Sequence, residues 1–145
     1  MIVVPFEPDD LGELLETGGE AFAGSLLRQP GYGDMLKASG PAWTALDDAE
    51  RIVGCGGLAL EHPGCSIAWT LLHPELSGPH MLALHRNARK ALEAATTRRV
   101  QADCDPAFAP ARRWLELLGF QYEGIRRAYA PDGRDMALYA RVTGG

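Results

Sequence analysis

The segment 111–120, with the sequence Ala-Arg-Arg-Trp-Leu-Glu-Leu-Leu-Gly-Phe, constrains the fold of this chain more than any other. Its apolar residues recur at helical spacing, and Gly119 follows the last of them. Glycine commonly ends a helix, because it has no Cβ and enters the left-handed backbone region without a clash. The pattern predicts a short amphipathic helix over residues 108–118, after which Phe120 leads into a new strand.

Two runs of β-forming residues flank a second informative segment, Pro131, Asp132 and Gly133. These residue types favour tight turns, since proline presets one backbone angle and glycine accepts a positive φ. The pattern predicts a closing hairpin with strands over residues 122–129 and 134–142.

The strongest helical pattern covers residues 79–96. Ser77 or Gly78 can cap its start, and Pro79 is well placed as its first residue. Its predicted buried stripe consists of Met81, Leu84, Ala88, Leu92 and Ala95.

A helix is also predicted near the start of the chain, where Asp10 and Glu13 have the spacing of a capping box. Its apolar stripe includes Gly18 and ends at Phe22. A further short helix is expected over residues 34–38.

Strands complete the pattern, and they are expected at residues 1–6, 43–46, 52–60, 65–72 and 100–104. The strand over 65–72 is apolar on both faces, which is typical of a central strand covered on both sides. The order predicts a mixed α/β fold with one central sheet of about six to seven strands flanked by about four helices.

Composition limits the classes of function. A chain of 145 residues can bury a core, and residues 1–145 are expected to form one domain. The formal net charge of −5 argues against a general nucleic-acid surface, because phosphate binding needs clustered lysine and arginine. Arg112-Arg113 and similar pairs are expected on solvated faces. No signal peptide or membrane span is expected.

The cysteines are Cys55, Cys65 and Cys104, and they show no CxxC spacing. An odd number in this arrangement favours reduced thiols and a cytoplasmic setting. The histidines show no HExxH pattern, and no cysteine–histidine group has zinc spacing, so no metal is expected.

Several motifs in residues 98–142 together resemble the GCN5-related N-acetyltransferase (GNAT) superfamily. They are the helix ending in Leu-Gly-Phe, the pair Glu123-Gly124, and the stretches Asp-Gly-Arg-Asp and Leu-Tyr-Ala-Arg-Val of the closing hairpin. The order of elements is also the GNAT order. The resemblance implies a GNAT-like fold and direct acetyl transfer from acetyl-coenzyme A to a small-molecule or peptide amine.

A narrower resemblance, to short phage and prophage GNAT-like proteins, rests on the tryptophan-containing strand, the Gly-Pro-His-Met-Leu-Ala-Leu helix start and the Arg-Arg-Trp helix. It implies an alternative function, a catalytically degenerate phage-associated structural or interaction protein with a virion partner. The oligomeric state is left open, a homodimer included.

The family resemblance also implies the cofactor site. In the family, the strand over 65–72 and the helix after it bind coenzyme A, with a strand N–H holding the thioester carbonyl and a glycine-rich turn holding the pyrophosphate. Carried over to this chain, the cofactor-binding residues are Leu71, Leu72, Ser77, Gly78, His80 and Met81. The turn lacks the family's leading Arg or Gln, and Pro79 removes one amide donor. A helix cap without a ligand therefore stays an open alternative.

Glu61, Asp103 and His73 are the catalytic candidates. Glu61 could take the amine's proton directly or through water, Asp103 is a competing carboxylate, and His73 follows the cofactor strand. The plainer explanations are an exposed strand end for Glu61 and a solvent-facing side chain for Asp103. Leu115 occupies the position where many family members carry a proton-donating tyrosine.

Other conspicuous side chains have structural explanations. His80 and His85 are expected to be solvated on a polar helix flank. Trp69 and Trp114 are expected in the core, because large rings dominate packing.

Overall fold

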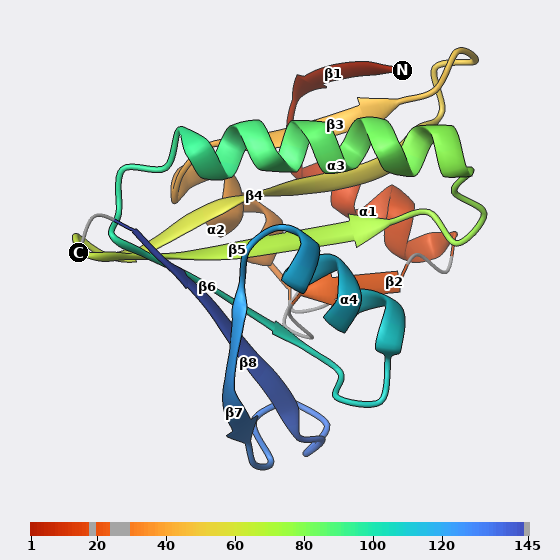
Figure 1. Cartoon of the computed structure of the whole chain (residues 1–145). Helices are drawn as coiled ribbons and strands as arrows, with labels where there is room; N and C mark the ends of the chain where they lie inside the picture. Colours follow the sequence, from red (N-terminus) through yellow and green to blue (C-terminus); the bar gives the residue numbers. More distant parts are fainter. Residues whose placement is uncertain (18–19, 24–29, 144–145) are drawn as a thin grey trace.

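The computed structural model describes residues 1–17 and 30–143 in full, and of residues 20–23 the backbone. The strands are β1 (Ile2–Pro5), β2 (Glu20–Ala23), β3 (Ala42–Leu46), β4 (Ile52–His62), β5 (Cys65–Leu72), β6 (Arg99–Cys104), β7 (Gln121–Arg126) and β8 (Met136–Val142). They form one sheet in the order β1-β3-β4-β5-β6-β8-β7, and β2 also pairs with β5 (Figure 1). The predicted mixed α/β fold with a central sheet is confirmed.

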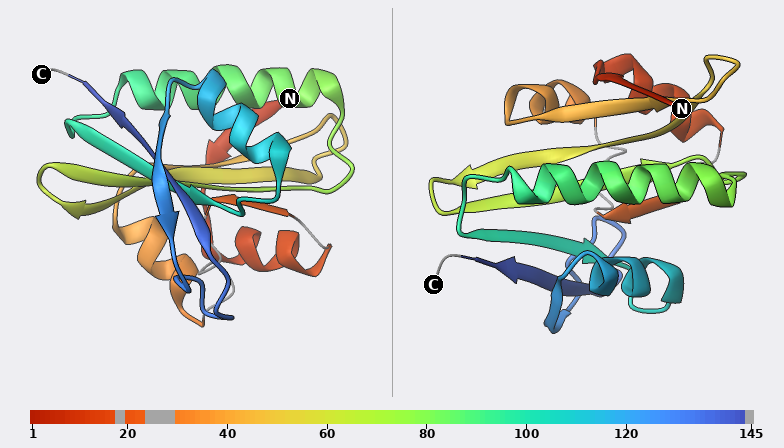
Figure 2. Two further views of the ribbon diagram at one scale, coloured as in Figure 1. Left: turned by 60° about the horizontal axis from the view of Figure 1, so that its bottom comes forward. Right: turned by 45° about the horizontal axis from the view of Figure 1, so that its top comes forward.

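Four helices lie on the two faces of this sheet among the described residues: α1 (Pro8–Glu16), α2 (Tyr32–Ala38), α3 (Gly78–Glu93) and α4 (Ala109–Leu117). Figure 2 shows α3 and α4 on one face, and α1 and α2 on the other. None of the described helices is long and apolar enough to cross a membrane.

The start of α3 follows the prediction. Ser77 is the N-cap, and its side chain accepts a hydrogen bond from the backbone N–H of His80 at 3.3 Å. The helix ends at Glu93, earlier than the predicted residue 96. Thr97, just beyond, donates to the backbone oxygen of Arg99 and to the hydroxyl of Ser66, which anchors the connection to β6.

The first helix differs from its prediction at both ends. Its cap is Glu7, whose N–H donates to the Asp10 carboxylate at 3.0 Å, so Asp10 is the partner in the capping box and not the cap. The helix ends at Glu16, and Phe22 belongs to β2. Gly18, predicted on the helix, lies outside the described residues. A Gly-Gly pair at 18–19 is costly in a helix interior, which explains the earlier end.

The C-terminal motifs form the elements that they predicted. Helix α4 ends at Leu117, and Gly119 just after it has a φ of 93°. This positive φ is what a glycine at the end of the helix predicted. Strands β7 and β8 are shorter than expected, because a loop over 127–135 separates them. Ala130 and Arg134 close the tip of that loop through a backbone hydrogen bond of 3.0 Å.

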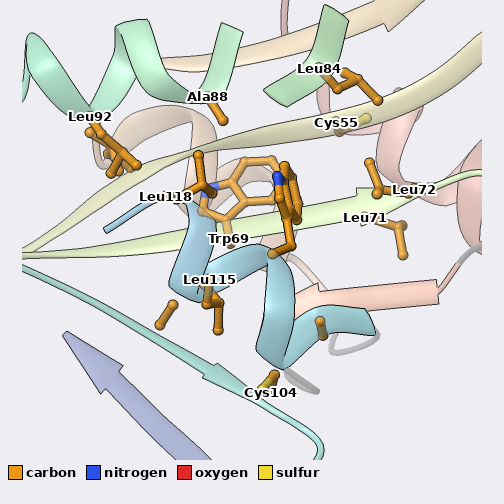
Figure 3. Close-up of a cluster of buried hydrophobic side chains, with 14 of the residues drawn as sticks. Cys55, Trp69, Leu71, Leu72, Leu84, Ala88, Leu92, Cys104, Leu115 and Leu118 are labelled. Carbon is orange, nitrogen blue, oxygen red and sulfur yellow. The ribbon is translucent and has the colours of Figure 1, made fainter. Parts of the chain in front are cut away.

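The buried hydrophobic cluster includes residues from both faces of the sheet, and Figure 3 shows the part of it beside α3 and α4. Leu84, Ala88 and Leu92 of α3 are buried there, as their helical spacing predicted. Trp69 and Trp114 are also buried, which confirms their assignment to the core.

Strands β5 and β6 diverge, and this divergence positions the site. They pair in parallel only where Cys65, Ser66 and Ile67 face residues 99–101. Beyond that point the strands separate, and β2 lies between their ends (Figures 1 and 2). Strand β2 pairs with residues 70–72 of β5 in antiparallel register.

Candidate active site

A groove of about 720 Å³ opens between the end of β5, the start of α3 and α4. Its apolar lining includes Leu76, Leu82, Phe108 and Leu117. Leu82 and Leu117 are exposed, so the groove presents apolar surface to solvent. An open apolar channel beside a helix start suits a ligand with an uncharged arm and an anionic end.

The predicted cofactor residues lie along this α3–α4 groove and at the start of α3. Leu72, Gly78 and Met81 line it. A Cβ added to Gly78 would meet no atom within 4 Å, so the space above this residue is open. The His80 N–H is bound by the Ser77 side chain, and the Met81 N–H donates to the Ser77 backbone oxygen at 2.9 Å. The helix start is therefore capped internally, and His80 would have to exchange its partner to bind an anion.

The backbone direction distinguishes Leu71 from Leu72. The His73 N–H donates to Val53 in β4 at 2.9 Å, and the Arg99 N–H of β6 donates to the Gly64 oxygen at 3.1 Å. Amide direction alternates along a strand, so odd-numbered residues of β5 address β4 and even-numbered ones address the opposite edge. Leu72 therefore offers its backbone on the edge where the strands diverge, whereas Leu71 does not.

Among the residues that the structure describes, three basic side chains line the α3–α4 groove: His73, His85 and Arg113. The Glu75 N–H donates to Nδ1 of His73 at 3.0 Å, which leaves Nε2 of that ring for other partners. Arg113 forms no ion pair within the part of the chain that the structure describes. Sequence reasoning missed Arg113, although its spacing from Pro110 and Leu117 predicts one helix face.

His85 is not a solvated histidine, as the sequence had suggested. Its Nδ1 accepts a hydrogen bond from Nε1 of Trp114 at 3.0 Å. This bond joins α3 to α4 beneath the α3–α4 groove. The prediction was wrong because the partner lies 29 residues away in the sequence.

A second group of polar side chains lies on the opposite face of the sheet. We call Glu61, Gln101, Asp103 and Arg126 the carboxylate cluster. The Asp103 side chain is 10% exposed, and its Oδ1 lies 3.2 Å from Nε of Arg126. That oxygen accepts no aligned hydrogen bond among the described residues. The solvent-facing explanation for Asp103 is therefore wrong.

Burial affects the acidity of Asp103. It raises the pKa of this carboxyl, the charge of Arg126 opposes the rise, and the charge of Glu61 adds to it. A buried carboxyl with a raised pKa is a common feature of functional sites, because it holds or takes a proton more readily than a solvated one.

Glu61 is exposed and reaches the same cluster through Gln101. The Gln101 amide donates to Glu61 over a long 3.5 Å, and its oxygen accepts from Nε of Arg99 at 2.9 Å. Arg99 also donates hydrogen bonds to both carboxylate oxygens of Glu123, at 2.6 and 3.1 Å. That contact holds the pKa of Glu123 below its usual value. Arg99 thus turns the Gln101 amide toward Glu61.

Aromatic rings border the carboxylate cluster. The guanidinium of Arg126 lies 4.6 Å from the ring centre of Tyr129. Tyr32, from α2, lies close enough to Tyr129 for the two to interact, and burial is the main cause of the raised pKa of Tyr32. Helix α2 therefore interacts electrostatically with the β7–β8 loop through these two tyrosines.

The structure brings Glu61 and Asp103 together and separates both from His73. Ala102 and Leu115 line one small internal cavity on the α3–α4 face. Asp103, the next residue, points to the other face because side chains alternate along a strand. His73 lines the α3–α4 groove instead.

Within the described part of the chain, one group of possible metal ligands also forms, although the sequence predicted none. Donor atoms of Glu61, His62 and Cys65 lie within 4.8 Å of one another. A register shift between Leu60 and His62 brings these side chains to the same hairpin end. The cation of Arg99 acts on the Cys65 thiol and would oppose a metal ion there.

No protein-family model and no curated protein matches the chain, but solved structures match nearly all of it. A GNAT superfamily phosphinothricin acetyltransferase from Sinorhizobium meliloti, in complex with acetyl-coenzyme A, superposes with a TM-score of 0.73 at 19% identity, over 99% of this chain and 88% of that one. The ribosomal-protein-S18-alanine N-acetyltransferase from Escherichia coli gives 0.70 at 16% identity, over 99% and 96%. A mutant spermidine N-acetyltransferase from Vibrio cholerae gives 0.68 at 14%, over 98% and 95%.

These matches show the fold. The chain has the GNAT superfamily fold that its motifs resemble, over nearly its full length.

Proposed function

We propose that this chain is an N-acetyltransferase, which moves an acetyl group directly from acetyl-coenzyme A to a small-molecule or peptide amine. The observation that carries the proposal is the α3–α4 groove, which joins the diverging end of β5 to the start of α3. The resemblance assigns coenzyme A to this strand and helix. The phosphinothricin acetyltransferase that shares the fold was solved with acetyl-coenzyme A.

The residues along the groove fit such a donor in part. The backbone N–H groups of Ser77, Gly78 and His80 would hold phosphate oxygens, and Arg113 would add a positive charge. The backbone of Leu72 would hold the thioester carbonyl. When bound, the donor supplies an activated acyl group as a thioester.

Asp103 is the residue that we propose as the proton acceptor. An ammonium must lose a proton before its nitrogen can attack a carbonyl. The raised pKa of Asp103 makes it a better base than an ordinary aspartate, and Arg126 holds its position. Glu61, exposed beside it, would pass the proton on to water. His73 lies on the other face and would serve the donor.

The proposal includes one domain over residues 1–145, a cytoplasmic location and no nucleic-acid partner. A second candidate function is that of a degenerate GNAT-fold interaction module. Two observations favour it: the internal cap at Ser77, and the pairing of β2 with the end of β5. Neither observation bears on a phage virion partner or on a homodimer.

Acetyl transfer to a panel of amines tests the first function. We expect saturable transfer that falls strongly in Asp103→Asn. The matched control is Asp105→Asn, which removes a partly exposed turn carboxylate paired with Arg134. Rates equal to the uncatalysed reaction for amino acids, polyamines and peptide N-termini would contradict the proposal and favour the interaction module.

A further inference from the structure

The edge of β5 that faces away from β4 has few backbone groups that could bind a ligand. Strand β4 pairs with β5 along its whole length on one side. On the other side the pairing with β6 ends at Ile67. Beyond Ala68, which adjoins the last β6 pair, the even-numbered residues that direct donors and acceptors to this edge are Thr70 and Leu72. These are the groups that the proposed donor needs.

Strand β2 already occupies this edge. Glu20 faces Leu72, and Ala23 faces Thr70, in antiparallel register. Because the backbone groups of Leu72 and Thr70 point to this side, they are directed at β2. One strand edge pairs with one extended partner at a time.

We propose that β2 is a self-occluding strand, which competes with the pantetheine arm of the acyl donor for the backbone of Leu72 and Thr70. Donor binding then requires β2 to leave β5. The inference rests on the proposed function and goes beyond it, because it assigns β2 a role in controlling access to the donor site.

The pairing of β2 is suited to exchange. It is four residues long, and its register shifts between Ala21 and Ala23, so its ladder with β5 is short and irregular. Among the described residues β2 pairs with no other strand. If the paired form dominates in the free protein, the apparent affinity for the donor falls by the fraction of molecules with a free edge.

Ala23→Pro tests the proposal, because proline removes the amide that faces Thr70 and leaves the net charge unchanged. Ala23→Ser is the matched control, since it keeps the amide. We expect Ala23→Pro to bind acetyl-coenzyme A roughly tenfold more tightly than the wild type, as for the loss of about one competing hydrogen bond. Adenosine 3′-phosphate 5′-diphosphate lacks the pantetheine arm and should bind all three proteins equally.

The possible results separate this inference from the proposed function. Equal acetyl-coenzyme A affinities in all three proteins would overturn the self-occluding strand and leave the acetyltransferase intact. Absence of binding in all three would overturn both.

Hydrogen exchange of the wild-type protein gives an independent reading that needs no variant. The amides of β2 should be protected in the free protein and lose protection when acetyl-coenzyme A is added, while Leu72 and Thr70 stay protected. Unchanged protection of β2 in the saturated protein would overturn the proposal.

Discussion

The α3–α4 groove and the carboxylate cluster lie on opposite faces of one sheet and consist of different kinds of residue. The groove is apolar and open, and it relies on backbone groups and on Arg113, which forms no ion pair with the residues that the structure describes. The cluster relies on charged side chains, with a buried carboxyl beside a guanidinium. The difference suggests a division of work, in which the groove holds the donor and the cluster handles the proton of the acceptor.

The largest effect should come from the cluster. Asp103→Asn should lower kcat about 10²- to 10⁴-fold, the usual contribution of a general base, and leave the dissociation constant of acetyl-coenzyme A unchanged. Steady-state kinetics and donor titration measure the two quantities separately. If the variant lost affinity for acetyl-coenzyme A by as large a factor as it lost kcat, the proposed division between donor binding and proton transfer would be contradicted.

A smaller effect is expected from the groove, and it should change donor binding and not turnover. Arg113→Ala should weaken acetyl-coenzyme A binding about five- to tenfold, because a charge-assisted contact to phosphate is lost at a solvent-exposed site. The KM for the amine should not change. Arg89→Ala is the control, since Arg89 pairs with Glu93 on α3. Equal losses in the two variants would mean that only net charge matters.

The pH dependence of stability sharpens the comparison further. Burial raises the pKa of Asp103 above 3.8, so the folded state binds more protons than the unfolded state just above that pH. Wild-type stability therefore falls, from this group, as pH rises from 3.8 through the raised pKa, and Asp103→Asn removes that fall. Urea unfolding over this range should show a variant that gains stability relative to wild type as pH rises. A relative loss would place the charged carboxylate in a stabilising role.

The smallest effect is expected in the reactivity of the buried core thiols, Cys55 and Cys104. Burial raises the pKa of Cys55 to about 12 and that of Cys104 to about 11. The native protein should therefore react with a thiol reagent at about pH 8 only as fast as it unfolds. Rapid labelling of Cys55 or Cys104 in the native protein would show that this core opens locally.

Local signals predicted the elements of the C-terminal half. Ser77 and Pro79 marked the start of α3, and Gly119 marked the end of α4, because caps act within a few residues. The strand over 65–72 was predicted to be central for the same reason, because its own residues are apolar on both faces.

Long-range pairing could not be predicted in the same way. Residues 20–23 continue a helical stripe in the sequence, and only the open edge of β5 makes them a strand. The burial of Asp103 and the bond between His85 and Trp114 likewise depend on elements far apart in the chain. The site residues that depend on such contacts are those that the sequence misjudged.

Calorimetric titration of the wild-type protein with acetyl-coenzyme A tests the assignment of the α3–α4 groove most directly. We predict saturable 1:1 binding with a micromolar dissociation constant, and a thermal shift that reports the same affinity. Absence of both heat and thermal shift at millimolar ligand would contradict it, and would leave a GNAT fold whose groove no longer takes the donor.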